Sequence, residues 1–208
     1  MRTRILLALG FSGLLCLLGP LGATTCPAFV KPEYKGAESC KKCHLLQYET
    51  WRKSRMASSF EALKPCDLET EEGKRLAGRR KEGHLDPEKD YRKDPKCLKC
   101  HTTGYGEPGG YPAEVTEESR GLAAKREGVQ CEACHGPGSL YIPFFAEKEN
   151  EKYKRSEVQK LGLFLPNKDT CIRCHNRESP FAPEEFDFVE LKKKGTHEHV
   201  RLRYDHDD

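Results

Sequence analysis

The pattern Cys-x-x-Cys-His occurs four times in the sequence. Each copy brings two thiols and an imidazole together within five residues. The paired sulfurs can form thioether bonds to the two vinyl groups of one haem, and the adjacent histidine can then ligate the haem iron from below. The thiols are Cys40, Cys43, Cys97, Cys100, Cys131, Cys134, Cys171 and Cys174, and the histidines are His44, His101, His135 and His175.

Other chemistry can use the same cysteine pairs. Four such pairs could build two zinc sites with four thiolate ligands each, and a single pair could be a thiol redox centre. Neither alternative explains why a histidine follows the second cysteine in every copy. A zinc site is also less expected in an exported protein, which this chain resembles at its N-terminus. The joint pattern therefore predicts four covalently attached c-type haems, whose irons would carry electrons.

The N-terminal residues resemble an export signal. Arg2 and Arg4 precede an apolar stretch over residues 5–18, and small residues follow a break at Pro20. This arrangement predicts a signal peptide over residues 1–23, a haem-bearing domain over residues 24–208, and a periplasmic location. An uncleaved membrane anchor is the alternative, although the stretch is short and interrupted by Gly and Ser. No segment of the mature chain is apolar enough to span a membrane.

Two cysteines of the mature chain lie outside the haem motifs, Cys26 and Cys66. In an oxidising compartment such a pair suggests a disulfide. Cys26 could instead be free or carry a lipid anchor, but Thr25 stands where a lipidation signal usually has Gly or Ala. The sequence leaves the disulfide open.

The mature chain is poor in residues that build a core. Leu, Ile, Val and Phe make up roughly one residue in six, a content at which a highly charged chain usually fails to fold unaided. Four porphyrins would supply the missing apolar surface, so we expect haem to form much of the core. Basic and acidic runs match each other, with a formal net charge of +3 for the whole sequence, which argues against nucleic-acid binding.

The elements that position the motifs are expected to be helices. The clearest helix is predicted over residues 42–63, where the apolar residues repeat with a period of 3.6 and Pro65 follows. Its apolar face would comprise Leu45, Tyr48, Met56, Phe60 and Leu63. Further helices are predicted over residues 67–82, 117–126, 156–161 and 183–195, with turns over residues 102–112 and 136–138. No convincing strand pattern appears, which predicts a mainly α fold with extensive loops.

The second axial ligand of each iron decides what the haem does. A second His or Met makes an electron-transfer haem, whereas an open position can bind a small molecule. The candidates outside the motifs are Met56, His84, His197, His199 and His206. Met56 either packs against a ring system or ligates a haem other than the first, since a continuous helix would carry it away from His44. His197 and His199 lie close together after a helix end, and His206 lies in an acidic tail.

Several segments accompany the haem motifs in a recognisable order. They are Trp51, Met56-Ala57, Phe60 to Pro65, Leu85 to Tyr91, Gly104-Tyr105-Gly106, Gly109-Gly110-Tyr111, Gly128 to Gly138 and His197-Glu198-His199. Together with the motifs, they resemble the tetrahaem cytochrome c-554 family of ammonia oxidisers over residues 38–202. The resemblance implies a multihaem cytochrome c fold, mainly helical, with closely stacked haem pairs.

The resemblance also carries expectations for the axial ligands. It implies that the iron on His101 lacks a sixth ligand and that His197 is a distal ligand. Two residues depart from the family pattern. Met56 stands where the family has a distal His, and Phe145 stands where the family has the distal His of the first haem. The first iron is then open, or His84 replaces the lost ligand.

These observations favour a periplasmic carrier of electrons over an enzyme. The resemblance implies redox partners of two kinds, an oxidoreductase that donates electrons and a membrane-associated acceptor. The alternative is a reductase of nitric oxide or a similar nitrogen oxide at a five-coordinate haem, which would need an open iron, access and a proton donor. A haem-dependent sensor or scaffold is a third alternative, but the sequence contains no recognisable output domain.

Overall fold

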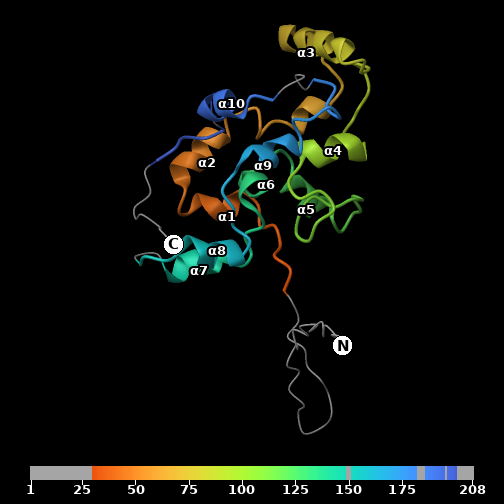
Figure 1. Cartoon of the computed structure of the whole chain (residues 1–208). Coiled ribbons are helices and arrows are strands. Elements are labelled where there is room, and N and C mark those ends of the chain that lie inside the picture. The colour runs from red at the N-terminus through yellow and green to blue at the C-terminus, as the bar shows by residue number, and fades with distance from the viewer. Residues whose placement is uncertain (1–29, 149–150, 182–185, 195, 201–208) are drawn as a thin grey trace, which may run out of the picture. The chain divides into compact units, whose positions relative to one another are not determined.

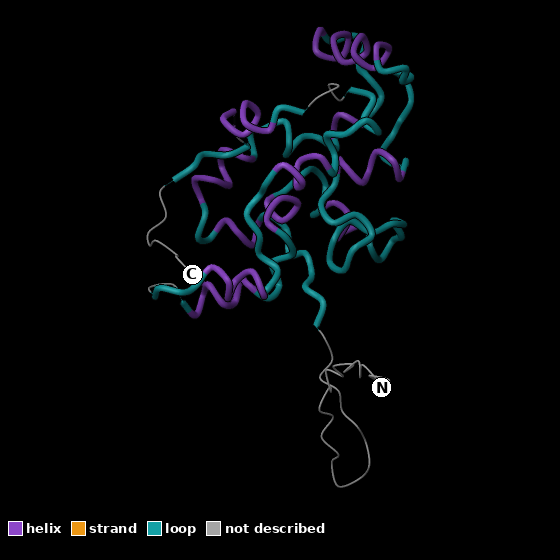
Figure 2. The backbone as a smooth tube through the Cα atoms, viewed as in Figure 1, coloured by secondary structure: helices purple, strands orange, loops and turns teal. Residues whose placement is uncertain are grey.

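Short helices joined by long loops make up the chain. The computed structural model describes residues 30–148, 151–181, 186–194 and 196–200. The chain divides into two units, Met1–Lys31 and Pro32–Asp208, and all the described helices lie in the second (Figure 1). The described residues form no strand, and one isolated bridge pairs Thr102 with Glu127 (Figure 2). The mainly α fold with extensive loops is therefore confirmed.

The helices are short, and five of those described begin or end within or beside a haem motif. In chain order the described elements are α1 (Glu38–Lys41), α2 (Leu45–Trp51), the 3-10 helix η1 (Glu61–Leu63), α3 (Glu71–Glu82), α4 (Pro95–His101), α5 (Arg120–Ala124), α6 (Cys131–His135), α7 (Tyr141–Glu147), α8 (Arg155–Lys160), α9 (Lys168–Ile172) and α10 (Phe188–Lys194). No helix in the described ranges has both the length and the apolar composition that a membrane crossing requires.

The long helix predicted over residues 42–63 is wrong as a continuous element. The structure divides it into α2 and η1, with turns between them. The backbone carbonyls in the break bind other segments, because Met56 O accepts from Val129 N at 2.9 Å and Ser59 O contacts His101 Nδ1 at 2.6 Å. These tertiary partners take carbonyls that a helix would use for its own hydrogen bonds. The argument that a continuous helix carries Met56 away from His44 therefore no longer applies.

The other helix predictions agree better with the structure. Helix α3 lies within the predicted range 67–82 and begins at Thr70, whose side chain accepts from Gly73 N at 3.0 Å. This cap and the acidic first turn explain the later start. Helices α5 and α8 lie at the predicted ranges 117–126 and 156–161 within one to three residues. Helix α10 ends at Lys194 as expected, whereas the predicted start at Pro183 lies outside the described residues.

The apolar core of the protein atoms is small. One cluster of buried residues is formed by η1, α4, α5 and the loops beside them, and Leu85, Cys97 and Tyr105 pack against it. Its members are Phe60, Leu63, Tyr91, Leu98, Tyr111 and Ala123. Meanwhile Leu45 and Leu46, which directly follow the first motif, are 56% and 50% exposed. Leu45 therefore does not join the buried face that its spacing predicted.

The glycine-rich turn over residues 102–112 folds back on itself, as predicted. Tyr111 N donates to Thr103 O at 2.9 Å, and Gly106 N donates to Tyr111 O at 2.8 Å. A Cβ atom at Gly110 would lie 1.9 Å from Gly104 O, so no larger residue fits there. This turn follows the second motif in the chain and brings Tyr111 into the core cluster.

Two predictions concern the N-terminal region. The signal peptide over residues 1–23 and the proposed lipid or disulfide at Cys26 lie outside the described residues. Cys66 is described, and it is half-buried with a free thiol.

Candidate functional site

Each Cys-x-x-Cys-His motif is wound into a helical turn. The second motif forms the end of α4, the third is α6 itself, and the fourth begins in the last turn of α9. In the first motif His44 N donates to Cys40 O at 2.9 Å, which closes a turn between α1 and α2. Because positions three and four apart share one side of a helical turn, both sulfurs and the imidazole face the same way.

Local sequence explains why these turns form. In α4 the Asp94 side chain accepts from Lys96 N at 2.9 Å, and Pro95 occupies the first helical position. In α9 the Asn167 and Thr170 side chains form a reciprocal capping box. Helix α6 ends at Gly136, whose φ of 83° favours glycine. These caps begin or stop the turns of the second, third and fourth motifs, whereas α1 and α2 beside the first motif have no side-chain cap at their N-termini.

The four motifs contact one another in a definite order. The Cys40 thiol hydrogen-bonds with that of Cys131, which raises the pKa of Cys40 and lowers the pKa of Cys131. The Cys174 thiol likewise lowers the pKa of Cys100 to about 7.

Burial raises the pKa of Cys134, and the nearby Cys171 raises it further. The first motif is thus beside the third, the third beside the fourth, and the fourth beside the second. Thioether formation would remove these thiol titrations but leave the order of neighbours.

The motif imidazoles are held in the form that ligates a metal. His101 Nδ1 lies 2.6 Å from Ser59 O, so its proton is shared with the carbonyl and Nε2 is left free. Burial lowers the pKa of His101 and His135, which are half-buried, whereas His44 and His175 are exposed in the protein alone. A lowered pKa favours the neutral imidazole, as an iron ligand must be.

His197 lies close to the first and third motifs. Its ring centre is 6.4 Å from that of His135, and its charge lowers the pKa of His44 in addition to the effect of burial. Two imidazoles that bind one metal from opposite sides through metal–nitrogen bonds of about 2.0–2.1 Å have ring centres roughly 6.4 Å apart. The spacing of His135 and His197 therefore fits an iron between them.

The backbone fixes the orientation of His197. Its Nδ1 lies 2.7 Å from Glu198 O, which leaves Nε2 free, and Glu198 N donates to Thr50 Oγ1 of α2 at 2.9 Å. His199 is next to it, with ring centres 4.8 Å apart, but is exposed.

The remaining candidate ligands occupy other places. His84 is exposed, has a φ of 55°, and follows α3. Helix α7, which carries Phe145, lies at the other end of the second unit from α3 (Figure 1). Met56 is half-buried, and its backbone carbonyl binds Val129 two residues before the third motif. His206 lies outside the described residues. No three His, Cys, Asp or Glu side chains in the described ranges converge as a zinc site would require.

An aromatic cluster on α7 and the loop before α8 was not predicted. Phe145 packs against Tyr141, Phe144 and Tyr153, with ring centres 5.8, 6.1 and 5.4 Å away. Burial raises the pKa of Tyr141, and the charges of Glu132 and of the thiol Cys40 raise it further, which places this ring beside the first and third motifs. The repeated aromatic residues over 141–153 were the available signal, but Pro143 obscured the helix.

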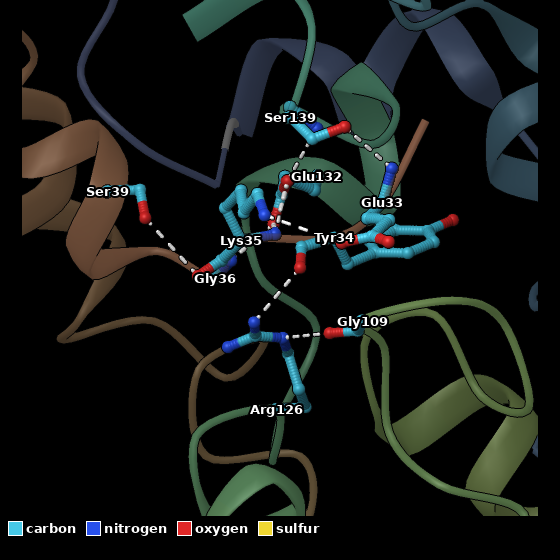
Figure 3. A network of polar contacts seen from close by, with 10 residues as sticks. Glu33, Tyr34, Lys35, Gly36, Ser39, Gly109, Arg126, Glu132 and Ser139 are labelled. Carbon is cyan, nitrogen blue, oxygen red and sulfur yellow. Dashed lines mark hydrogen bonds and ion pairs between the residues drawn. The ribbon is translucent and has the colours of Figure 1, made fainter. Parts of the chain in front are cut away.

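A buried carboxylate inside the third motif was also missed. Glu132 is 1% exposed. Its two oxygens accept from the backbone N–H groups of Lys35 at 2.9 and 3.0 Å, Gly36 at 2.6 Å and Gly138 at 2.7 Å (Figure 3). The side chain between the two cysteines therefore ties residues 32–37 to the motif. No residue spacing or motif in the sequence predicts this contact.

Arg126 binds the other side of the same segment. Its Nη2 donates to Tyr34 O at 3.0 Å and its Nε donates to Gly109 O at 2.7 Å (Figure 3). Gln130 adds a third tie, because its Oε1 accepts from Ala37 N at 2.8 Å. Residues 32–37 thus lie between the glycine-rich turn and the third motif.

Known proteins that are similar to this chain are cytochromes. The family model described as cytochrome c554 and c-prime matches residues 39–136. Cytochrome c-554 of Nitrosomonas europaea is 32% identical over 194 residues, which cover 81% of this chain and 77% of that protein. The solved structure of reduced cytochrome c554 from the same organism superposes with a TM-score of 0.69 at 28% identity, covering 84% of this chain and 89% of that one.

Proposed function

Because the chain belongs to the cytochrome c554 family of multihaem electron-transfer cytochromes, we propose that it carries electrons between two redox partners through four covalent haems. Each Cys-x-x-Cys pair holds one haem by thioether bonds, and His44, His101, His135 and His175 are the proximal ligands. The bound haems supply reversible one-electron chemistry. The protein is exported to the periplasm, takes electrons from an oxidoreductase and passes them to a membrane-associated acceptor.

The contact order of the motifs is the observation that carries this proposal. Neighbouring thiols join the first motif to the third, the third to the fourth, and the fourth to the second. Haems held by neighbouring motifs would be near enough to exchange electrons, so an electron entering at one end of the series could reach the other.

A second candidate function rests on the aromatic cluster of α7. The helix carries Phe144 and Phe145 and no His or Met, so it offers no sixth ligand to a nearby iron. An open first haem, together with the open second haem implied by the family pattern, would suit a reductase of nitric oxide or a related nitrogen oxide. The electron-carrier function remains the main proposal, since a reductase would need access and a proton donor at the open iron as well.

One experiment distinguishes the two functions. Intact-mass measurement of the exported protein is expected to give the mass of four added haems. Paramagnetic resonance of the oxidised protein, with and without nitric oxide, then reports the open irons. We expect rapid exchange of electrons with a small redox protein and no sustained consumption of nitric oxide. Sustained consumption in the presence of a reductant would favour the reductase, and a mass without haem would refute both functions.

We propose His197 as the distal ligand of the third haem, opposite His135. His197→Ala is expected to convert one low-spin haem into a high-spin haem and to raise its potential, because a strong nitrogen ligand is lost. His199→Ala is the matched control, since its ring is adjacent but exposed, and it should leave the spectrum unchanged. Paramagnetic resonance of the oxidised variants measures both effects. Equal spectra for the His197 variant and the wild type would refute the assignment.

Met56 and His84 remain candidate distal ligands for other haems. Met56 is half-buried near the second and third motifs through its backbone contact with Val129. His84 is close to the chain after the fourth motif, because it follows Gly83, where a Cβ atom would lie 2.7 Å from Phe181. This position supports a role for His84 at the second or fourth haem rather than at the first.

A further inference from the structure

Arg80 is a buried charge that the haem sites alone do not explain. It lies in the last turn of α3 and is 3% exposed. Its guanidinium donates four hydrogen bonds to backbone carbonyls: Nη2 to Ala62 O at 2.7 Å and Lys64 O at 2.6 Å, and Nη1 to Pro87 O at 3.0 Å and Lys89 O at 3.2 Å. All four acceptors are neutral.

None of the ion pairs in the described part of the chain includes Arg80. An arginine side chain stays protonated in proteins. Hydrogen bonds to carbonyls solvate the cation without cancelling its charge. The fold therefore keeps a net positive charge at this buried position.

The charge lies next to the second motif. The Arg80 Cζ atom is 5.2 Å from the centre of the Tyr91 ring, and Tyr91 belongs to the core cluster against which Cys97 packs. Residues 59–64 contact both groups: the carbonyls of Ala62 and Lys64 accept from Arg80, and the carbonyl of Ser59 binds His101 Nδ1. The guanidinium and the second motif therefore pack against the same short segment.

We propose that the buried charge of Arg80 raises the reduction potential of the haem held by Cys97, Cys100 and His101. This inference rests on the proposed function. Reduction adds one negative charge at the iron, and a fixed positive charge nearby stabilises the reduced form. Because Arg80 is buried, solvent and salt screen the interaction little. Arg80 would make this haem the preferred site for an electron.

Arg126 provides a matched control. It is also buried, at 6% exposed, and donates to the backbone carbonyls of Gly109, Lys125 and Tyr34. Its guanidinium holds the glycine-rich turn and residues 32–37, and the Glu132 carboxylate is a charge that acts on it. Arg126→Gln therefore removes a comparable buried arginine and comparable hydrogen bonds while the guanidinium beside Tyr91 stays in place.

The test is an optical redox titration of the holoprotein for the wild type and for Arg80→Gln, Arg80→Lys and Arg126→Gln. We expect one of the four one-electron steps to move to lower potential in Arg80→Gln and to move less than half as far in Arg80→Lys, which keeps the charge. The step that moves should be the one lost when Cys97 and Cys100 are both replaced by Ser. The shift should persist at high salt.

Several results would overturn the inference. Equal shifts in Arg80→Gln and Arg80→Lys would mean that the lost hydrogen bonds matter and the charge does not. No shift, a common shift of all four steps, or an equal shift of the same step in Arg126→Gln would also contradict it. A wild-type chain with no haem titration would instead refute the proposed function, and this inference with it.

Discussion

A chain produced without haem attachment is expected to lose most of its helical structure. The described residues bury few large apolar side chains, and the main cluster has six members. Leu45 and Leu46 beside the first motif, and Ile172 inside the fourth, are 56%, 50% and 36% exposed in the protein alone. Haem would cover such residues, and a core this small cannot offset the conformational entropy of a chain of 208 residues.

Far-ultraviolet circular dichroism and limited proteolysis measure this effect. The haem-free chain should show a weak helical signal and rapid cleavage throughout, whereas the holoprotein in the same buffer should resist cleavage. A chain that lacks only the fourth haem, through replacement of Cys171 and Cys174 by Ser, should fall between the two. A haem-free chain with the full helical signal and slow cleavage would contradict the view that haem is most of the core.

Glu132→Gln is expected to lower the free energy of unfolding of the holoprotein by about 2–4 kcal/mol. Both oxygens of the carboxylate accept from backbone N–H groups of Lys35, Gly36 and Gly138. A carboxamide keeps one acceptor oxygen and turns its NH2 group toward another donor. At least one buried N–H group then loses its acceptor, and the attraction of the negative charge is also lost.

Chemical denaturation followed by circular dichroism measures the change. Glu49→Gln is the control, because Glu49 forms an exposed pair with Arg52 at 3.0 Å, and exposed pairs contribute little. Its unfolding midpoint should match that of the wild type. If the Glu132 variant also unfolds at the wild-type midpoint, the carboxylate does not hold residues 32–37 in place.

Local signals in the sequence predicted a substantial part of the structure. The motif predicted which sulfurs and imidazoles lie together, although no predicted helix covered the second, third or fourth motif. The cap at Thr70 and the glycine after α6 are visible in the sequence. The glycine-rich turn and the absence of strand patterns were also readable. Each of these features depends on residues a few positions apart, which is the range over which propensity and periodicity carry information.

The contacts between distant segments could not be predicted in this way. The break after α2 depends on His101 and Val129, which take the carbonyls of Ser59 and Met56. A helix pattern over residues 42–63 contains no sign of these partners. The role of Glu132 likewise depends on backbone groups about a hundred residues away, and its position between two cysteines gave no signal that it is buried.

The ties on residues 32–37 have a consequence for the order of maturation. Glu33 N binds Ser139 at a sequence separation of 106 residues, and the contacts of this segment with Glu132, Gln130 and Arg126 span 92 to 97 residues. Residues 32–37 therefore cannot dock until residue 139 has joined the folding chain. The short helices close over a few residues, so docking of this segment is a slower, long-range step that follows their formation.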